Sequence, residues 1–405
     1  MSPYLPFDII ALVIDIVGEN KDTDLLKELA LVSHSFLQIC SKHLFATVEL
    51  RDYDEVPSYQ FLSSKKGFIK LLKSRPDVVR YIRKLTYRVS RAHIFQENDR
   101  LLSPILLPLL PSFSRLNSLA ISVSRLNWNN LDTSLTSAFL RLMHLPTINH
   151  IHLSYIENFP LFSLTPCVNL HRLDICDLTL HNPLKEDFPD ILVEMMPKIR
   201  EFHILGSFQL TTKLLHAKRQ DGQPAFNFMD LRRFSMDLGL FETDDHSDIP
   251  YLLQNAKLLE RFDLFVGHGR SIAGILSPDA RILKYLDLAI PFKFSYMSHL
   301  RGICEELEAF AGHNLLETLS FKVVLYYDLV TEDSIGSLFQ EVETVLVKPG
   351  WSMLRQVFFK VSIAPFEGSR KLSEVLKSLP DKYLTHLSKL ESIAFDYLAY
   401  VRSDE

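Results

Sequence analysis

A short pattern of hydrophobic positions recurs along most of this chain. Each copy reads apolar-x-x-apolar-x-apolar, and eleven copies follow one another between residues 79 and 397. The last two apolar positions of a copy lie two residues apart, which is the period of a strand with one buried face. The pattern therefore predicts eleven strands. The copies are Ile82/Leu85/Tyr87, Leu116/Leu119/Ile121, Ile148/Ile151/Leu153, Leu170/Leu173/Ile175, Ile199/Phe202/Ile204, Leu231/Phe234/Met236, Leu259/Phe262/Leu264, Leu283/Leu286/Leu288, Leu316/Leu319/Phe321, Leu354/Val357/Phe359 and Leu390/Ile393/Phe395.

Helical or looped stretches separate the copies. The clearest are residues 134–145, 188–196, 297–311 and 334–347. Strands that alternate with helices predict an α/β fold with a parallel sheet. Because each unit buries its face against its neighbours, such an array lengthens one core instead of dividing into many domains.

The first fifty residues form a separate and strongly apolar stretch. Between residues 9 and 17 only Asp15 is polar, and a helix that is apolar on all sides must be buried on all sides. A short set of helices covers one side of it, so we expect a partner protein to cover the other. The alternative is an ordinary helical bundle packed on the rest of the chain. Pro6 fits a first helical turn, and Asp24 and Ser33 are candidate N-caps of two further helices.

Over roughly residues 3–50 the chain resembles the F-box, the adaptor-binding module of cullin-type ubiquitin ligases. The resemblance lies in an opening Leu-Pro, an acidic residue and two aliphatics, then a Leu-rich helix that runs into Val-Ser and an aromatic residue. These positions are Leu5, Pro6, Asp8 (where Glu is more usual), Ile9 and Ile10, then Leu25, Leu26, Leu29, Leu31, Val32, Ser33 and Phe36. Residues 30–33 with Leu44, Phe45, Val48 and Leu50 also resemble the divergent F-box families of mushroom-forming fungi.

This resemblance implies three helices that bind a Skp-type adaptor, which in turn joins a cullin scaffold. The adaptor contacts that it implies are Leu5, Pro6, Ile9, Ile10, Val13, Leu29, Val32 and Phe36.

The repeated pattern resembles the leucine-rich repeat, a solenoid with one strand per unit and a helix on its outer side. Copies here begin 22 to 38 residues apart, whereas the usual repeat has about 20–29 residues, so the solenoid is irregular. The predicted fold is α/β: a three-helix F-box, then an irregular leucine-rich-repeat solenoid with a parallel sheet. A parallel α/β sheet that is not a solenoid is the alternative. The expected divisions are residues 1–50, a connecting helical segment at 51–78, the repeat domain at 79–397 and a polar tail at 398–405. Residues 46–50 would cap the first strand.

Residues that alternate with the buried positions face the other side of the predicted sheet. A lateral row of arginines there runs beside a row of aspartates. Neighbouring strands are about 4.8 Å apart, so these charges either neutralise one another in ion pairs that contribute little or bind a target. Arginine and aromatic residues are frequent in binding hot spots. The candidate target-binding residues are Arg172, Arg233 and Arg261, the adjacent Asp174, Asp237 and Asp263, the histidines His150, His152 and His203, and the aromatic anchors Phe265, Tyr285 and Phe358.

Two longer segments interrupt the array. Residues 206–228 carry Lys213, Lys218 and Arg219 and are interpreted as a basic loop, and residues 242–250 are acidic. Both follow a predicted strand, so both are expected to reach over one rim of the sheet, where loops often carry function. Solvated insertions without a function are the alternative.

Composition narrows the class of protein. The chain has 405 residues, 47% of them hydrophobic and 23% charged, with a formal net charge of −5. This acidic balance argues against general nucleic-acid binding, which needs a basic field. The four cysteines have no metal-binding or CxxC spacing, so reduced thiols are expected. No apolar run approaches the roughly 20 residues of a membrane span, and residues 9–14 lack the flanks of a signal peptide. We expect a soluble protein of the cytoplasm or nucleus.

Recognisable catalytic and metal-binding motifs are missing from the sequence. His150 and His152 share a strand face, but two histidines without a closing carboxylate or thiolate at a known spacing are more often surface residues. Gly267 and Gly269 are not followed by the ending of a P-loop, and neither G-x-S-x-G nor H-E-x-x-H occurs. We therefore expect no enzyme, no metal and no cofactor.

Together these features predict the substrate-recognition subunit of a Skp–cullin–F-box ubiquitin ligase. The N-terminal helices would bind the adaptor and the repeat domain an unknown protein target, with neither nucleic acid nor membrane as partner. Three alternatives stay open. They are a non-catalytic leucine-rich-repeat scaffold without a ligase role, an enzyme with a site on the sheet face, and a nucleic-acid-associated protein that uses the basic residues 213–219.

Overall fold

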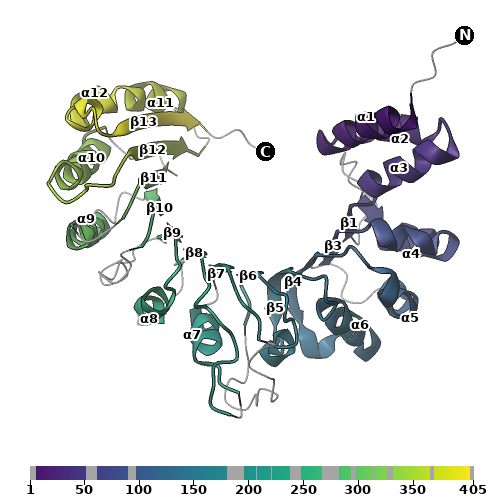
Figure 1. The fold of residues 1–405 in the computed structure, drawn as a ribbon. Coiled ribbons are helices and arrows are strands. Elements are labelled where there is room, and N and C mark those ends of the chain that lie inside the picture. Colours follow the sequence, from purple (N-terminus) through teal and green to yellow (C-terminus); the bar gives the residue numbers. More distant parts are fainter. Residues whose placement is uncertain are drawn as a thin grey trace, which may run out of the picture. The chain divides into compact units, whose positions relative to one another are not determined.

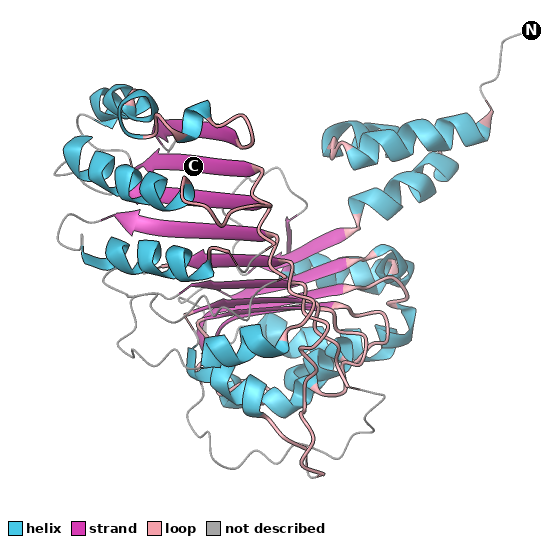
Figure 2. Ribbon diagram, turned by 60° about the vertical axis from the view of Figure 1, so that its left-hand side comes forward, coloured by secondary structure: helices cyan, strands magenta, loops and turns pink. Residues whose placement is uncertain are grey.

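The computed structural model describes residues 6–51, 62–89, 97–179, 196–206, 208–219, 221–237, 248–266, 282–292, 298–312, 315–325, 332–364 and 369–401. The chain divides into two compact units. The first contains Met1–Pro197 and Ala217–Ala225, and the second contains Lys198–His216 and Phe226–Glu405. Each unit has its own run of parallel strands with helices against one face (Figure 1, Figure 2).

Three helices open the first unit, namely α1 (Phe7–Glu19), α2 (Thr23–Ala30) and α3 (His34–Leu44). Ser33 caps α3 as predicted, because its hydroxyl accepts a 3.2 Å hydrogen bond from the N–H of Phe36. The predicted cap at Asp24 is wrong. Helix α2 begins earlier, and the carboxylate of Asp22 accepts from the N–H of Leu25 at 3.1 Å.

The six described strands of the first unit are parallel and follow the order β2-β1-β3-β4-β5-β6. Helices lie along one face of them (Figure 1). The strands are β1 (Thr47–Arg51), β2 (Leu62–Ser64), β3 (Lys84–Val89), β4 (Ser118–Asn127), β5 (His150–Glu157) and β6 (Arg172–Cys176). The helices are α4 (Lys65–Ser74), α5 (Glu97–Leu109) and α6 (Thr133–Met143), with short 3₁₀ helices at Pro76–Tyr81, Leu110–Ser112, Trp128–Asn130 and Leu161–Leu164.

The three-helix module joins this sheet through a very short connection. Only Phe45 and Ala46 separate α3 from β1, which pairs with β3 as the predicted cap of the array. The carbonyl of Ala46 accepts two backbone hydrogen bonds, from the N–H of Arg83 at 2.8 Å and from that of Lys84 at 2.9 Å. The junction is therefore part of the sheet's hydrogen-bonding network.

The second unit repeats the same arrangement, with parallel strands in sequence order from β7 to β13. Its helices lie along one face of these strands (Figure 2). The strands are β7 (Glu201–Leu205), β8 (Arg233–Asp237), β9 (Arg261–Phe265), β10 (Tyr285–Phe292), β11 (Thr318–Leu325), β12 (Gln356–Ile363) and β13 (Ala394–Val401). The helices are α7 (Phe208–His216), α8 (Asp248–Asn255), α9 (Ser298–Phe310), α10 (Glu332–Leu346), α11 (Ser369–Lys377) and α12 (Leu379–Tyr383), with a 3₁₀ helix at Leu387–Lys389.

The eleven sequence copies coincide with the strands β3 to β13. In the first ten copies all three apolar side chains are buried, at no more than 5% exposure. Their middle residues face one another across the ladder, from Leu85 to Leu173 in the first unit and from Phe202 to Val357 in the second. The prediction of one strand per copy is confirmed. The result is an α/β fold with long parallel sheets, consistent with a leucine-rich-repeat solenoid.

Aromatic side chains form part of this core. Phe202, Phe234 and Phe262 occupy the same position on three neighbouring strands, and none of them is exposed. The ring of Phe234 stacks between the other two, with ring centroids 5.7 and 5.4 Å apart. Such stacked pairs add to the burial of their apolar area, so the triplet holds these three strands together.

Three of the four predicted helical stretches coincide with helices of the structure. Residues 134–145, 297–311 and 334–347 correspond to α6, α9 and α10, while most of residues 188–196 lie outside the described part. The basic loop expected at residues 206–228 is wrong in part, because α7 occupies Phe208–His216 and buries one apolar side.

Two leucines one turn apart, Leu210 and Leu214, form that buried side of α7. Of the acidic segment, only residues 248–250 are described, and they open α8. Strand β2 was not predicted, because Leu-Ser-Ser carries no alternation of apolar and polar residues. Strand β13 runs to Val401, past the expected end of the repeats at residue 397.

Candidate functional site

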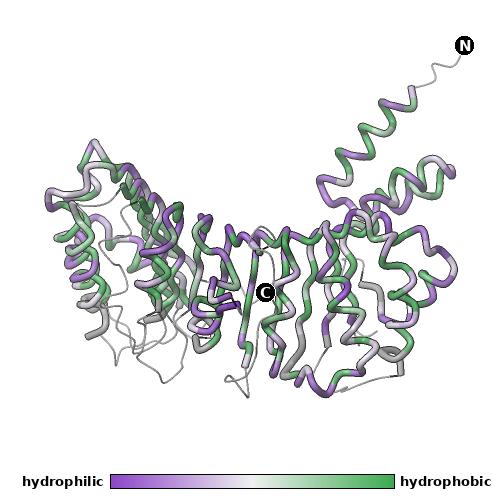
Figure 3. The backbone as a smooth tube through the Cα atoms, turned by 60° about the horizontal axis from the view of Figure 1, so that its bottom comes forward, coloured by the Kyte–Doolittle hydropathy of each residue, from purple (hydrophilic) through white to green (hydrophobic). Residues whose placement is uncertain are grey.

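A hydrophobic stripe is exposed along α1. Ile9, Leu12, Val13 and Ile16 follow the i, i+3, i+4, i+7 spacing of one helix face, and each is 45–58% exposed. We call these four residues the α1 stripe. Figure 3 shows the hydrophobic stretches of this helix near the N-terminus. Contiguous apolar side chains in water mark interaction surfaces. Further exposed apolar residues of this module are Phe7 on α1, Leu25 on α2, and Leu31 and Val32 in the connection between α2 and α3.

The neighbouring face of α1 is covered by the module itself. Ile14 is buried together with Leu26 of α2 and with Cys40 and Leu44 of α3. Ile10 and Val17 pack against this cluster from positions one turn away on α1. Helices α2 and α3 therefore cover one side of α1 and leave its other apolar side exposed.

The predicted adaptor contacts divide between these two faces. Pro6 precedes α1 as its N-cap instead of lying in the first turn, and its carbonyl accepts from the N–H groups of Ile9 and Ile10. The exposed contacts are Pro6, Ile9, Val13 and Val32; Ile10, Leu29 and Phe36 are half-buried against the module's core, and Leu5 lies outside the described residues.

Asp15, the one polar residue in the apolar stretch, ties α1 to α3. The side chain of Lys42 donates to its carboxylate at 2.6 Å, and Nε2 of His43 does so at 2.7 Å. These hydrogen bonds hold the pKa of the Asp15 carboxyl below its usual value. Gly18 leaves the space for the His43 ring, since a Cβ there would meet ring atom Nδ1 at 2.2 Å. The contacts fix the rotation of α1 and hence the direction of the α1 stripe.

On the sheet face of the first unit, the predicted polar residues gather around Asp174. Its carboxylate accepts from Nε2 of His150 at 2.8 Å and from the guanidinium of Arg172 at 3.0 Å, and Nδ1 of His152 lies 3.7 Å away. Burial of Asp174 opposes its ionisation, yet these donors hold the pKa of its carboxyl well below its usual range. The sequence left self-neutralisation and target binding as alternatives, and here the charges are paired with each other.

Ser118, His150 and Asp174 on three adjacent strands form a hydrogen-bonded chain. The serine hydroxyl lies 3.0 Å from Nδ1 of His150, whose Nε2 contacts Asp174. The residue types are those of a nucleophilic triad, but Ser118 is only 7% exposed. Its backbone N–H is used in the sheet, where it donates to Arg83, so it offers no oxyanion hole. The chain acts as a structural cross-strand link.

We expect Asp174→Asn to lower the free energy of unfolding by about 1–3 kcal/mol at neutral pH, because a buried, charge-assisted set of hydrogen bonds is weakened. Since the folded pKa of Asp174 is depressed, its contribution is complete above the unfolded pKa of about 3.9 and is lost as the pH falls through the folded value. Urea unfolding of both proteins checks this. Their difference should be largest above pH 5 and shrink toward pH 3; a constant difference would contradict the assignment.

A second ladder of charges spans the sheet face of the second unit. The carboxylate of Asp263 accepts from Arg233 and from Arg261, each at 2.8 Å. Arg261 also lies 3.8 Å from Asp287, which pairs with Lys322. The two carboxylates are largely buried between basic side chains that are about 40% exposed. Asp287 and Lys322 were not among the candidates, although they occupy the same alternating phase of their strands.

The remaining candidates share this face without forming one cluster. Tyr285 is 40% exposed and lies beside Arg261 in the ladder. Phe265 is four residues farther along β9, about 13 Å at the usual strand rise, and Phe358 lies two strands away from Tyr285, on β12. These two rings are half-buried. His203 lies 3.9 Å from Glu201, and Asp237 faces Phe265 across the ladder.

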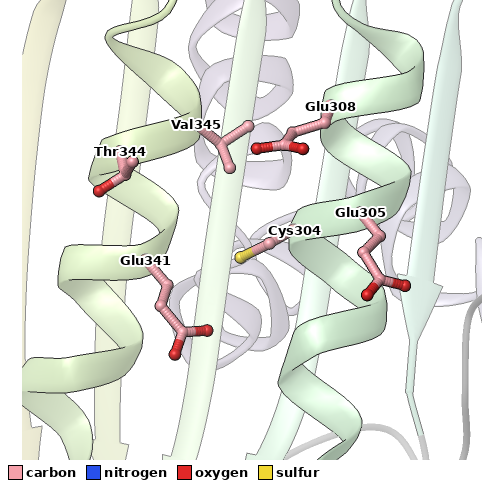
Figure 4. A pocket seen from close by; sticks show the side chains of 6 residues that line it. All are labelled: Cys304, Glu305, Glu308, Glu341, Thr344 and Val345. Carbon is pink, nitrogen blue, oxygen red and sulfur yellow. The ribbon is translucent and has the colours of Figure 1, made fainter.

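A hollow of about 260 Å³ lies between α9 and α10 of the second unit. Figure 4 shows Cys304 and Glu308 of α9 pointing toward α10. Burial, with carboxylates nearby, raises the pKa of the Cys304 thiol to about 12, so the thiol stays protonated and is a poor nucleophile. The lining residues are Cys304, Glu305, Glu308, Glu341, Thr344 and Val345.

Two negative findings apply to the described part of the chain. It contains no group of three or more His, Cys, Asp or Glu side chains arranged to hold a metal ion. None of its helices has both the length and the apolar character needed to cross a membrane.

No family model and no curated protein matches the sequence. Among solved structures, an internalin from Listeria monocytogenes aligns over 86% of this chain and 86% of its own, with 10% sequence identity and a TM-score of 0.29. The fold is established by the strand order and the register within each unit.

Proposed function

We propose that this chain is the substrate-recognition subunit of a Skp–cullin–F-box ubiquitin ligase. In this proposal the N-terminal module binds a Skp-type adaptor, which joins the cullin scaffold, and the repeat domain binds a protein target. The chain itself supplies binding energy and geometry, while the ubiquitin-loaded enzyme brought by the cullin supplies the reaction.

The observation that carries the proposal is the α1 stripe. Its four large aliphatic side chains stand in water on a helix whose other face is already packed. Burying a fully exposed side chain of this size contributes about 1.5–3 kcal/mol. These four are about half exposed, so a partner protein that covers them gains about half of that for each. The ordered set of motif residues between Leu5 and Phe36 identifies the expected partner as a Skp-type adaptor.

Co-expression with a Skp-type adaptor, followed by size-exclusion chromatography, tests this assignment. We expect a one-to-one complex with the unchanged chain. The double change Ile9→Asp and Val13→Asp should weaken it by 100-fold or more, about 2.7 kcal/mol, since it places two charges in the contact. Both residues are exposed, so the module should still fold. Ile10 is a poorer choice because it packs against the module's core.

A matched control is Leu258→Asp. Leu258 is 46% exposed, similar to Ile9 and Val13, but lies in the second unit. Its change should leave adaptor binding unaltered. If the unchanged chain does not bind the adaptor, or if the Ile9→Asp, Val13→Asp variant still binds it, the adaptor-binding role of the α1 stripe is excluded.

The second candidate function is a leucine-rich-repeat interaction scaffold without ligase activity. The charges on the sheet face pair with one another, so they do not mark a surface that binds a target for ubiquitination. This pairing is compatible with a scaffold. Reconstitution with adaptor, cullin and ubiquitin-loaded enzyme separates the two. A ligase subunit should bring the cullin into a stable complex, whereas a scaffold should bind the adaptor or a target and leave the cullin free.

A further inference from the structure

The last strand of the second unit has an open edge. All eight residues of β13 pair with β12, and among the described residues no strand pairs with its other side. The N–H of Ala394 donates to the carbonyl of Arg355, so the even-numbered residues direct their backbone groups toward β12. The backbone groups of the odd-numbered residues 395–401 therefore point outward. Such an edge is a template for another strand.

Among the described residues the core is also open at this end. Phe395 and Tyr397 face the buried side of the sheet but are only half-buried, whereas Val357 and Phe359, their register partners on β12, are at most 2% exposed. On the opposite face Leu398 is 55% exposed. One more strand alongside β13 would cover both the backbone groups and these apolar side chains.

The two outermost strands differ in how they discourage pairing. Strand β2 has three residues, Leu62–Ser64, and very short edge strands resist association. Strand β13 has eight residues with the sequence AFDYLAYV, which contains no proline, lysine or arginine and whose register to β12 is unbroken. Only Asp396 carries a charge. The edge therefore lacks the usual protection.

We propose that β13 pairs antiparallel with β13 of a second copy of this chain, around a two-fold axis at Leu398. In this register Phe395 faces Val401 and Tyr397 faces Ala399 through the outward-pointing backbone groups. The two Leu398 side chains face each other on the axis. The proposal is independent of the function proposed for the N-terminal module.

The side chains favour a second copy over an unrelated strand, because the strand complements itself. With the axis at Leu398, Asp396 of each copy lies opposite Tyr400 of the other, and its carboxylate accepts from the phenol. The amine of Lys360 already lies over the Tyr400 ring, 5.1 Å from its centroid, so a cation stands next to each incoming carboxylate.

Other axis positions are less favourable. An axis at Asp396 would place two carboxylates opposite each other, which destabilises a pair. An axis at Tyr397 would place Asp396 against Leu398, and one at Ala399 would shorten the paired stretch to residues 397–401. An axis at Leu398 keeps both the favourable side-chain pairs and the full length of the paired stretch.

Light scattering after size-exclusion chromatography of the full chain is the first test. The expected mass is about 93 kDa, twice the 46.7 kDa of one chain. Leu398→Asp should return the mass to that of one chain, because two carboxylates would meet on the axis, while the circular dichroism spectrum stays unchanged. Leu258→Asp is the control and should leave the dimer intact. A single chain at all concentrations, or a dimer that survives Leu398→Asp, would overturn the proposal.

A cysteine pair tests the register. In a non-hydrogen-bonded antiparallel pair the Cα atoms are about 4.5 Å apart, within the 4.4–6.8 Å range of disulfides. Leu398→Cys should therefore give a covalent dimer on mild oxidation. Ala394→Cys, on the same exposed face of β13, would sit about 26 Å from its equivalent and should not exceed the unchanged chain. Equal cross-linking of both variants would exclude this register.

Discussion

Replacing Phe234 by alanine is expected to lower the free energy of unfolding of the second unit by about 3–5 kcal/mol, the usual cost of removing a buried aromatic ring. The effect should lie at the upper end. The ring is fully buried and stacks on both Phe202 and Phe262, so its removal leaves a cavity between two strands that share it. Chemical denaturation followed by circular dichroism measures the change.

Tyr285→Ala is the matched control for this prediction. Tyr285 is also an aromatic residue on a strand of the second unit, but it lies on the opposite face and is 40% exposed. Its loss should change the free energy of unfolding by no more than about 0.5 kcal/mol, as for most surface substitutions. If the two variants were equally stable, the stacked phenylalanines would not be the core that holds these strands.

Glu343→Ala is expected to destabilise the C-terminal end of the second unit by about 1–3 kcal/mol, the usual cost of leaving a buried donor, here the N–H of Leu387, without an acceptor. Glu343 lies on α10 and is 6% exposed. Its Oε1 accepts from the backbone N–H groups of His386 at 2.7 Å and Leu387 at 3.0 Å. It thereby attaches the segment that leads into β13 to α10. Hydrogen exchange of β13 amides would report the loss.

Glu343→Gln separates this role from a simple charge effect. Both backbone donors bond to Oε1, and the amide oxygen of glutamine can take its place with the same shape. The amide nitrogen would then stand in the place of Oε2, which lies 3.2 Å from Nδ1 of His386. We expect Gln to retain most of the stability that Ala removes. Equal losses for both variants would mean that the negative charge, and not the acceptor, is what the segment requires.

The strands were predictable from sequence because their burial is uniform. Each of the first ten copies must present three apolar side chains to one continuous core, so the same spacing recurs from Ile82 to Phe359. The eleventh, at the end of the array, keeps the pattern although Phe395 is only half-buried. Strand β2 escaped prediction because it is short and polar, and α7 because two buried leucines are a weak signal within a basic segment.

The pairing of charges was not predictable, since it depends on side-chain reach across the sheet. Asp174 is bonded by Arg172 on its own strand and by His150 from the next one, whereas Arg233 reaches forward by 30 residues to Asp263. The alternation of side chains along the strands is compatible with pairing within one strand and with pairing between neighbouring strands. Sequence therefore placed these residues on one face but did not decide whether they bind each other or a target.

The N-terminal helix illustrates a different limit. Because nearly every residue from Ile9 to Val17 is apolar, the pattern contains two faces of equal hydrophobicity, and periodicity alone does not tell which one the chain covers itself. The structure assigns Ile10, Ile14 and Val17 to the module's own core and leaves the α1 stripe open. The predicted contacts accordingly mixed residues of both faces.

The short connection at Ala46 has a mechanical consequence. A flexible linker would let a bound partner sample many orientations, and its local concentration near the repeat strands would fall with linker length. Here the carbonyl of Ala46 accepts hydrogen bonds from the N–H groups of Arg83 and Lys84, so the helices are joined directly to the first strands. A partner bound to the α1 stripe, as proposed above, would thus be held at a fixed angle to β1 and β3.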